Sequence, residues 1–334
     1  MRIKDVAERA GVSPATVSRV LNDVSSVGPE YREKVLRAIE ESGYRPNRLA
    51  SNLRRQKAEM IGVVVSDIEN PHFTQMVRAV EDAAFRRGYR VLLCNTDESP
   101  EKQGAYLEML AAERVLGVLL SPSNPGGEEI SELIDLGIPV IAFDRTVEDP
   151  RADAVVVDNA AGTWLATEFL IRAGHERIGF ISGLGGIETS VERRLGYERA
   201  MREVGLESRS VDGGFRISDG GSATEALLET GDFTALLVSN NLMTIGALKI
   251  LREHGVSVPE EIALVAVDDP FWAELVEPPL TTLAQPVREM AGCAVGLLLE
   301  RIGGHRTRPR RVVFDFQLRV RGSCGTAVSR KGGV

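Results

Sequence analysis

Short apolar runs alternate with helical stretches from residue 60 onward, and this alternation constrains the fold more than any other feature. The apolar runs lie at 61–65, 90–94, 115–120, 139–143, 154–157, 177–181, 235–238 and 262–267. The helical stretches between them lie near 73–87, 101–112, 128–136, 160–173, 191–204, 222–229 and 241–254. Continuous apolar strands separated by helices predict parallel sheets that are covered on both faces. The pattern therefore predicts an α/β body of two doubly wound parallel-sheet subdomains, with a ligand cleft where their strand ends face each other.

The last part of the chain predicts several crossings between these two subdomains. A proline-rich segment at 278–286 reads as extended, and a helix near 286–300, a strand at 311–316 and a closing segment at 318–325 follow it. Further crossings are expected near 158–161 and 316–320. We expect an N-subdomain of about 59–157 and 286–315, and a C-subdomain of about 158–285 and 316–330. Several connections would allow hinge closure without separation.

The first 22 residues predict two short helices around a tight turn. The first helix would bury Val6, Ala7 and Ala10, and the second would bury Val17, Val20 and Leu21. Gly11 suits the turn, while Ser13 is an N-cap candidate and Pro14 suits the first helical position. Such a helix-turn-helix can place its second helix in the major groove of DNA.

A third helix is expected at 29–42, where Val35, Leu36 and Ile39 form an apolar stripe and Gly43 ends the helix. The basic segment after it could form one or two helical turns, or could be an ordinary linker. We therefore divide the chain into a small all-α DNA-binding domain at 1–45, a hinge helix and linker at 46–58, and an effector-binding and dimerisation domain at 59–330.

Charge separates the two ends of the chain. The net charge is −8, yet residues 1–57 hold 12 basic and 7 acidic residues, which leaves 28 basic and 41 acidic residues for the rest. A basic head on an acidic body is typical of a DNA-binding regulator, and chance charge bias on a helical surface is the alternative. The three cysteines and four histidines show no metal-ligand spacing, so we expect no metal and no cofactor. No signal peptide or membrane-spanning run is apparent, so we expect a cytoplasmic protein without a membrane partner.

Two segments, residues 4–22 and 44–50, resemble the LacI/GalR family of bacterial repressors, and the later segments fit the same order. The resemblance implies a periplasmic-binding-protein-like body and a role for each part of the head. Pro14, Ala15 and Thr16 match variable base-reading positions, and Arg19 matches an arginine that can pair with guanine. Ser18, Asn22 and Tyr44 are candidates for phosphate contacts. Asn47 and Ala50 match minor-groove positions beside Leu53, which matches a leucine that wedges between central base pairs. Packing of Leu53 against the body is the alternative.

Polar residues that follow the predicted strands are the candidates for effector binding. They are Asp67, Asp144, Arg145, Arg193, Asn240 and Asp268, with Phe73 and Trp272 as aromatic faces for a sugar ring. The resemblance implies that Arg193, Asn240 and Asp268 match ligand-binding positions of sugar-responsive members. The alternatives are that Asp144, Asp158 and Asp269 only cap helices or tie loops, and that Phe73 and Trp272 belong to the core. His72 by itself is weak evidence for a cleft residue.

These observations predict a homodimeric, ligand-responsive repressor that binds a pseudo-palindromic operator, with a sugar or sugar derivative as effector. A purine or nucleoside effector is the alternative, although Ile187 falls about where a purine-responsive relative has an arginine. A sugar-binding transport component would need a signal peptide and no DNA-binding head. The loop at 183–186 lacks the spacing of a phosphate-binding motif, and no catalytic constellation is recognisable, so we expect no enzyme. The tail after Cys324 has no leucine heptads, which favours a dimer over a tetramer.

Overall fold

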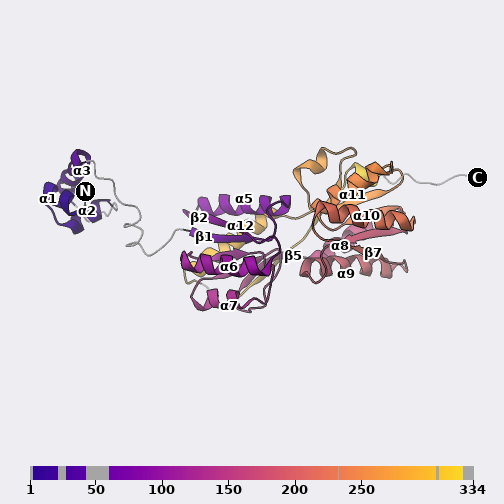
Figure 1. Ribbon diagram of the computed structural model, residues 1–334, viewed down its shortest axis with the longest axis horizontal. Helices are drawn as coiled ribbons and strands as arrows, with labels where there is room; N and C mark the ends of the chain where they lie inside the picture. The colour runs from indigo at the N-terminus through magenta and orange to yellow at the C-terminus, as the bar shows by residue number, and fades with distance from the viewer. Residues whose placement is uncertain (1–2, 22–27, 43–59, 232, 306–307, 326–334) are drawn as a thin grey trace, which may run out of the picture. The chain divides into compact units, whose positions relative to one another are not determined.

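The computed structural model describes residues 3–21, 28–42, 60–231, 233–305 and 308–325, and the chain divides into two compact units at 1–58 and 59–334 (Figure 1). The predicted Asn22, Tyr44, Asn47, Ala50 and Leu53 lie outside the described residues, as does the tail after Gly325. Each unit is described by itself.

The described residues of the first unit form three packed helices: α1 (Ile3–Ala10), α2 (Pro14–Leu21) and α3 (Pro29–Ser42). Its core contains Val6, Ala7, Ala10, Val17, Val20, Val35 and Ala38, which confirms the predicted stripes of the first two helices for every side chain described there. Leu36 was expected in this core, but its side chain is 52% exposed. Val35, Ala38 and Ile39 share one face of α3, whereas Leu36 follows Val35 by one position and therefore points about 100° away.

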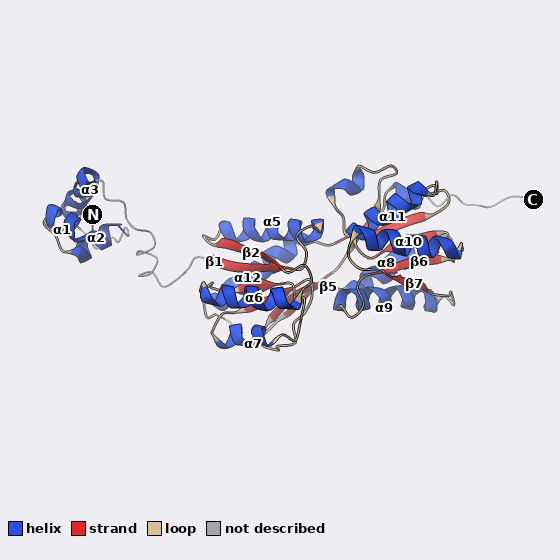
Figure 2. Cartoon of the chain, viewed as in Figure 1, coloured by secondary structure: helices blue, strands red, loops and turns tan. Residues whose placement is uncertain are grey.

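The second unit contains two six-stranded sheets, which confirms the predicted α/β body (Figure 2). The first sheet has the order β11-β5-β4-β3-β1-β2 and all of its pairs are parallel. Its strands are β1 (Met60–Val65), β2 (Arg90–Asn95), β3 (Val118–Leu120), β4 (Val140–Phe143), β5 (Asp153–Val157) and β11 (Arg311–Phe314). Its helices are α5 (Pro71–Phe85), α6 (Pro100–Ala112), α7 (Glu128–Asp135) and α12 (Val287–Ile302).

The second sheet has the order β12-β10-β9-β8-β6-β7, and β12 pairs antiparallel with β10 at its edge. Its strands are β6 (Ile178–Ser182), β7 (Arg209–Asp212), β8 (Ala235–Val238), β9 (Ala263–Val267), β10 (Thr281–Ala284) and β12 (Gln317–Arg319). Its helices are α8 (Asn159–Arg172), α9 (Glu188–Glu203), α10 (Ile217–Thr230) and α11 (Asn241–Glu253), with short 3-10 helices η1 (Phe271–Glu274) and η2 (Gly322–Cys324). We call each sheet with its helices a subdomain.

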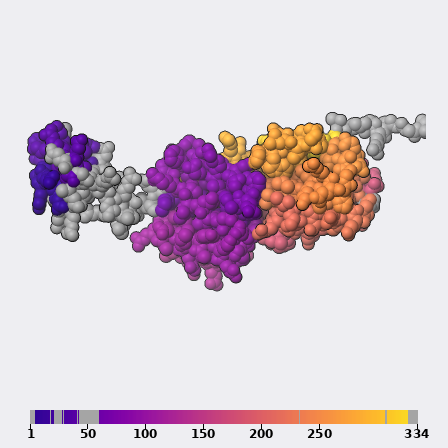
Figure 3. All heavy atoms as spheres, turned by 45° about the horizontal axis from the view of Figure 1, so that its top comes forward, coloured from indigo at the N-terminus to yellow at the C-terminus, as the bar shows by residue number. Residues whose placement is uncertain are grey.

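Three crossings join the first and second subdomains: between β5 and α8, between β10 and α12, and between β11 and β12. At the first crossing Asp158 caps α8, because its carboxylate accepts a hydrogen bond from the Ala161 N–H at 2.8 Å. The central strands are buried along almost their whole length, as the uninterrupted apolar runs predict. Figure 3 shows the two subdomains as adjoining lobes of the body. Among the described helices, none is long and apolar enough to cross a membrane.

Candidate functional site

Two buried aspartates occupy equivalent positions at the carboxyl ends of the two sheets. Asp144 follows β4 with φ 66°, and Asp268 follows β9 with φ 72°. Each donates its backbone N–H to the next strand, to the Val155 oxygen at 3.1 Å and to the Leu283 oxygen at 2.9 Å. Left-handed backbone is uncommon for residues other than glycine, and aspartate tolerates it better than most. The fold thus turns a carboxylate out of each sheet toward the same cleft.

His72 lies between these two carboxylates. It belongs to the first turn of α5, where the Asn70 side chain caps the helix by accepting the His72 N–H at 2.9 Å. The imidazole Nε2 is 3.6 Å from Asp144 Oδ1, and Nδ1 is 3.7 Å from Asp268 Oδ1. Burial opposes the charge on the imidazole, but the two carboxylates outweigh it and raise the pKa of His72 above its usual value. Conversely, His72 and Arg145 overcome the effect of burial and lower the pKa of Asp144.

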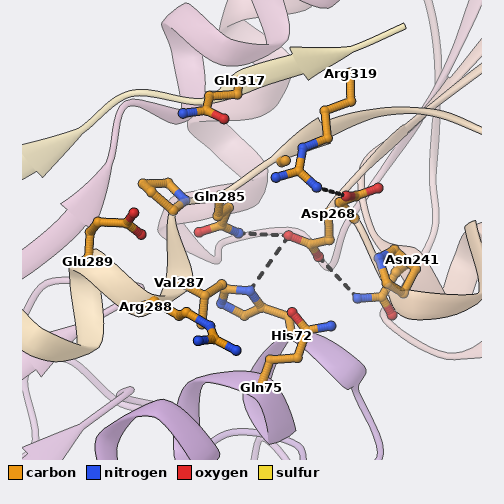
Figure 4. Close-up of a pocket in the computed structure, with 14 residues that line it drawn as sticks. His72, Gln75, Asn241, Asp268, Gln285, Val287, Arg288, Glu289, Gln317 and Arg319 are labelled. Atoms are coloured by element: carbon orange, nitrogen blue, oxygen red, sulfur yellow. Dashed lines mark hydrogen bonds and ion pairs between the residues drawn. The ribbon is translucent and has the colours of Figure 1, made fainter. Parts of the chain in front are cut away.

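Asp268 is held by amide groups as well (Figure 4). Gln285 Nε2 donates to its Oδ1 at 2.7 Å, and Asn241 Nδ2 donates to its Oδ2 at 3.2 Å. The same Asn241 amide reaches the first subdomain, where Asn70 Oδ1 accepts at 2.9 Å. Asp268 is therefore fixed by residues of α11 and of the β10–α12 crossing.

A second set of contacts joins the subdomains beside these residues. The Glu188 carboxylate, at the start of α9, accepts from the Thr146 N–H at 2.7 Å and from the Thr146 hydroxyl at 2.9 Å. Arg145 donates two 2.6 Å hydrogen bonds to Glu98, and its guanidinium lies 5.6 Å from the centre of the Phe215 ring. Arg145 and Glu98 belong to the first subdomain and Phe215 to the second, so the ring also bridges the cleft.

Arg193 and Asn240 complete the wall supplied by the second subdomain. Arg193 on α9 donates from Nε to Asn159 Oδ1 at 2.8 Å and from Nη1 to the Ser239 carbonyl oxygen at 2.6 Å. Asn240 is the N-cap of α11, and its Oδ1 accepts from the Met243 N–H at 2.9 Å. Both side chains are buried and held in place by these bonds.

These side chains enclose an inner cavity of about 20 Å³ between the subdomains. Its lining consists of Asp67, Asn70, His72, Phe73, Glu98, Asp144, Arg145, Thr189, Arg193, Phe215, Asn240, Asp268 and Gln285. An outer pocket of about 270 Å³ adjoins it and shares His72, Asp268 and Gln285 with it (Figure 4). The inner cavity holds about one water molecule, so a larger ligand fits there only if its walls move.

Comparisons with known proteins all indicate the same protein family. The model of bacterial regulatory proteins of the lacI family matches residues 2–47, and that of the periplasmic binding protein-like domain matches residues 167–324. The HTH-type transcriptional repressor PurR of Vibrio atlanticus (strain LGP32) is 37% identical over 306 residues, which cover 90% of this chain and 91% of PurR. The chain belongs to the LacI family of regulators.

Two solved structures of similar proteins match nearly the full length of this chain. The lac repressor dimer bound to operator and the anti-inducer ONPF has a TM-score of 0.85 at 27% identity, covering 98% of this chain and 99% of that one. The transcriptional regulator CelR in complex with cellobiose has a TM-score of 0.74 at 34% identity, covering 97% and 99%. This chain is thus a LacI-family transcriptional repressor, with a helix-turn-helix head for DNA and a periplasmic-binding-protein-like body for an effector.

The structure brings most of the predicted effector residues of this LacI-family body together. The inner cavity is lined by Asp67, Phe73, Asp144, Arg145, Arg193, Asn240 and Asp268. Trp272 is the exception, because it packs against a hydrophobic core cluster of the second subdomain and does not line this cavity. This placement agrees with the core alternative for Trp272. Phe73 belongs to the core and also lines the cavity.

Sequence reasoning missed several lining residues. They are Asn70, Glu98, Thr189, Phe215 and Gln285. The sequence contained a sign that Asn70 and Gln285 could line the cavity, because Asn70 follows the strand β1 and Gln285 ends the proline-flanked crossing. Phe215 follows β7, a strand that the sequence did not reveal, so nothing placed its ring at the strand ends.

The described part of the LacI-family head contains the expected second helix of the helix-turn-helix, α2. Ser13 begins α2, where its hydroxyl oxygen accepts the Thr16 N–H at 3.2 Å. Pro14, Ala15 and Arg19 are exposed on α2, and Thr16 is half-buried. Ser18 lies on the same helix, though its side chain is not described. The exposed face therefore offers one long cationic side chain, Arg19, among small or apolar ones.

Proposed function

We propose that this LacI-family repressor acts as a homodimer on a pseudo-palindromic operator and responds to a sugar or sugar derivative in the central cleft. Residues 1–45 form the DNA-binding domain, 46–58 the hinge and 59–330 the effector-binding and dimerisation domain. Pro14, Ala15, Thr16 and Arg19 face the bases, while Ser18, Asn22 and Tyr44 contact phosphates. Leu53 of each subunit enters the minor groove at the operator centre, beside Asn47 and Ala50.

The observation that carries the sugar assignment is the shared cavity of Asp268, Arg193 and Phe73. A buried carboxylate accepts hydrogen bonds, a buried guanidinium donates them, and a sugar hydroxyl does both. The Phe73 ring supplies an apolar face for the C–H side of a pyranose or furanose. The similar regulator CelR forms a complex with cellobiose, which supports a carbohydrate as the class of effector.

A purine is the second candidate, and the 37% identity to PurR favours it. Against it stands the loop before α9, where Ile187 occupies the N-cap position and is not part of the cavity lining. Of the residues just after this loop, Thr189 reaches the cavity with a hydroxyl group. The position where a purine-responsive relative has an arginine thus contributes no side chain to this cavity, which counts against a purine.

Effector binding changes operator affinity through the angle between the two subdomains. Opening of the cleft admits a ligand larger than one water, and this movement shifts the dimer contacts and the spacing of the hinge segments. Coupling of about 1–3 kcal/mol would change operator affinity roughly 5–150-fold. We infer a binding site without turnover, in keeping with a family of DNA-binding regulators that acts in the cytoplasm.

The proposal is tested by thermal shift of the full-length protein with cellobiose, ribose and adenine. We expect a sugar to raise the melting temperature, because it binds only the folded state. Asp268→Ala and Arg193→Ala should lose this shift and the effector response, yet retain sequence-specific gel shifts on genomic fragments. Arg202→Ala, an exposed change further along the same helix α9, is the matched control.

Two results would overturn parts of the proposal. A melting-temperature rise with adenine and with neither sugar would replace the sugar with the purine. The absence of any sequence-specific gel shift, with or without these ligands, would contradict the regulator itself.

A further inference from the structure

Both ring nitrogens of His72 face a carboxylate oxygen, one from each subdomain. Nε2 faces Asp144 and Nδ1 faces Asp268, and all three side chains are at most 9% exposed. A neutral imidazole has one N–H and one lone pair, so one of the two carboxylates would then face a lone pair. The doubly protonated ring is the form that presents an N–H to both. The two distances, 3.6 and 3.7 Å, are those of ion pairs and exceed hydrogen-bond length, so it is the charge of the imidazolium that both carboxylates attract.

The surrounding charges lead to the same state. Asp144, Asp268 and Glu98 are negative and largely buried, and Arg145 and Arg193 are positive and buried. Arg145 is matched by Glu98, whereas Arg193 donates to the neutral Asn159 oxygen and the Ser239 carbonyl oxygen. Protonated His72 makes this group of six charges neutral, and a neutral His72 leaves it with one uncompensated buried charge, which is costly.

Asp269, Arg288, Glu289 and Arg319 line the outer pocket with His72, and these two acidic and two basic residues balance in formal charge. Two other groups oppose the proton on His72. Arg193 on α9 repels it, and the N-terminal end of its own helix α5 also disfavours a cation. The neighbouring amides of Asn241 and Gln285 carry no charge and instead donate to Asp268. Asp144 and Asp268 are thus the groups that hold the proton on His72, and Asp268 is the one across the cleft.

His72 also lies between the inner cavity and the outer pocket. His72, Asp268 and Gln285 line both the inner cavity and the outer pocket, so they form the partition between them. His72 comes from the first subdomain and Asp268 from the second, so separating the subdomains breaks their contact (Figure 4).

We propose that His72 is a proton-operated latch: doubly protonated, it bridges Asp144 and Asp268 and holds the central cleft closed, and it gives up the proton when the cleft opens to admit the effector. This inference rests on the proposed effector site and specifies its regulation. Since opening releases a proton, effector affinity rises with pH through the range where closed His72 is protonated and open His72 is not. The rise is at most about tenfold per pH unit, the limit for one linked proton.

The first test needs no effector. Ring signals of the four histidines of the full chain are followed by NMR against pH, and His72→Gln identifies the signal of His72. We expect this signal to titrate above about 6.5, the ordinary histidine value, and Asp268→Asn to move it downward. A His72 that titrates at or below the ordinary value, or that is unaffected by Asp268→Asn, would overturn the latch.

The second test measures the proton directly. Calorimetric titration with the sugar that gives the thermal shift, in two buffers of different ionisation enthalpy near pH 7, should show release of up to one proton per site. His72→Gln should release none. His175→Gln is the matched control, because His175 lies outside the cleft, with Nδ1 3.0 Å from the Thr234 hydroxyl oxygen.

The outcomes separate the latch from the proposed function. Sugar binding with equal heats in both buffers would overturn the latch and leave the sugar effector intact. Failure of cellobiose, ribose and adenine alike to bind would count against the proposed function. The NMR titration of His72 without ligand would then decide whether the latch exists.

Discussion

At the scale of single residues, the hydroxyl of Tyr197 connects an edge strand of the second sheet to its neighbour. Its ring is fully buried and stacks on Phe180, with 4.9 Å between the ring centres. The hydroxyl donates to the Ile178 carbonyl oxygen at 2.7 Å and accepts the Arg209 N–H at 2.7 Å. Burial raises the pKa of Tyr197 to about 12, so the hydroxyl stays protonated at physiological pH. One side chain on α9 thus joins β6 to the short edge strand β7.

We predict that Tyr197→Phe lowers the free energy of unfolding by about 1–3 kcal/mol, because buried polar groups lose their partner while the ring volume is kept. Urea unfolding monitored by circular dichroism measures the change. Tyr31→Phe in the three-helix unit, where the ring is 51% exposed, should leave the body transition in place. Equal midpoints for Tyr197→Phe and wild type would show that the hydroxyl contributes nothing.

At the scale of elements, α10 and α11 approach each other through glycine. A Cβ atom at Gly246 would overlap the Ile217 carbonyl oxygen, and one at Gly220 would overlap the Met243 carbonyl oxygen. Each glycine thus meets backbone of the other helix, which cannot move aside as a flexible side chain could. The two helices position the loop before α11, where Asn240 lines the cavity.

We predict that Gly246→Ala destabilises the body by about 1–3 kcal/mol or more, since overpacking forces the helices apart. Thermal unfolding and effector affinity should both be measured, because displacement of α11 also displaces Asn240. Gly292→Ala on α12 is the matched control: its added Cβ meets no atom within 4 Å, so alanine there should be neutral or slightly stabilising. Equal stability of the two variants would refute the close approach.

Buried strands could be predicted from the local sequence, whereas an exposed edge strand could not. The buried strands β4, β8 and β9 were predicted because a strand covered on both faces reads as a continuous apolar run. The edge strand β7 has the sequence Arg-Ser-Val-Asp with an alternating, half-exposed pattern, so no apolar run marked it. The spacing of Leu36 to Ile39 fits a helix face and predicts a buried side chain, but the face of α3 that packs is centred on Val35 and Ala38.

At the scale of the whole molecule, we propose that control of the operator depends on residues 46–58, the last part of the first compact unit. We predict that Leu53→Ala weakens operator binding roughly tenfold or more, equivalent to about 1.4 kcal/mol. The reason is that paired leucines would no longer open the central base step. Fluorescence anisotropy with labelled operator measures this loss, while effector affinity should stay within error of wild type. Gln56→Ala serves as the control, and unchanged operator affinity in Leu53→Ala would refute the wedge.

The sequence by itself determined the helix-turn-helix, the alternation of strands and helices, and the polar residues at the strand ends. Each of these is a local property, because a periodic apolar pattern reports which face of a short segment is buried. Only the tertiary structure decided that His72 stands between Asp144 and Asp268, and that Trp272 packs into the core away from the inner cavity. Those contacts join residues far apart in the chain, and they depend on how two sheets pack across a cleft, which no local pattern encodes.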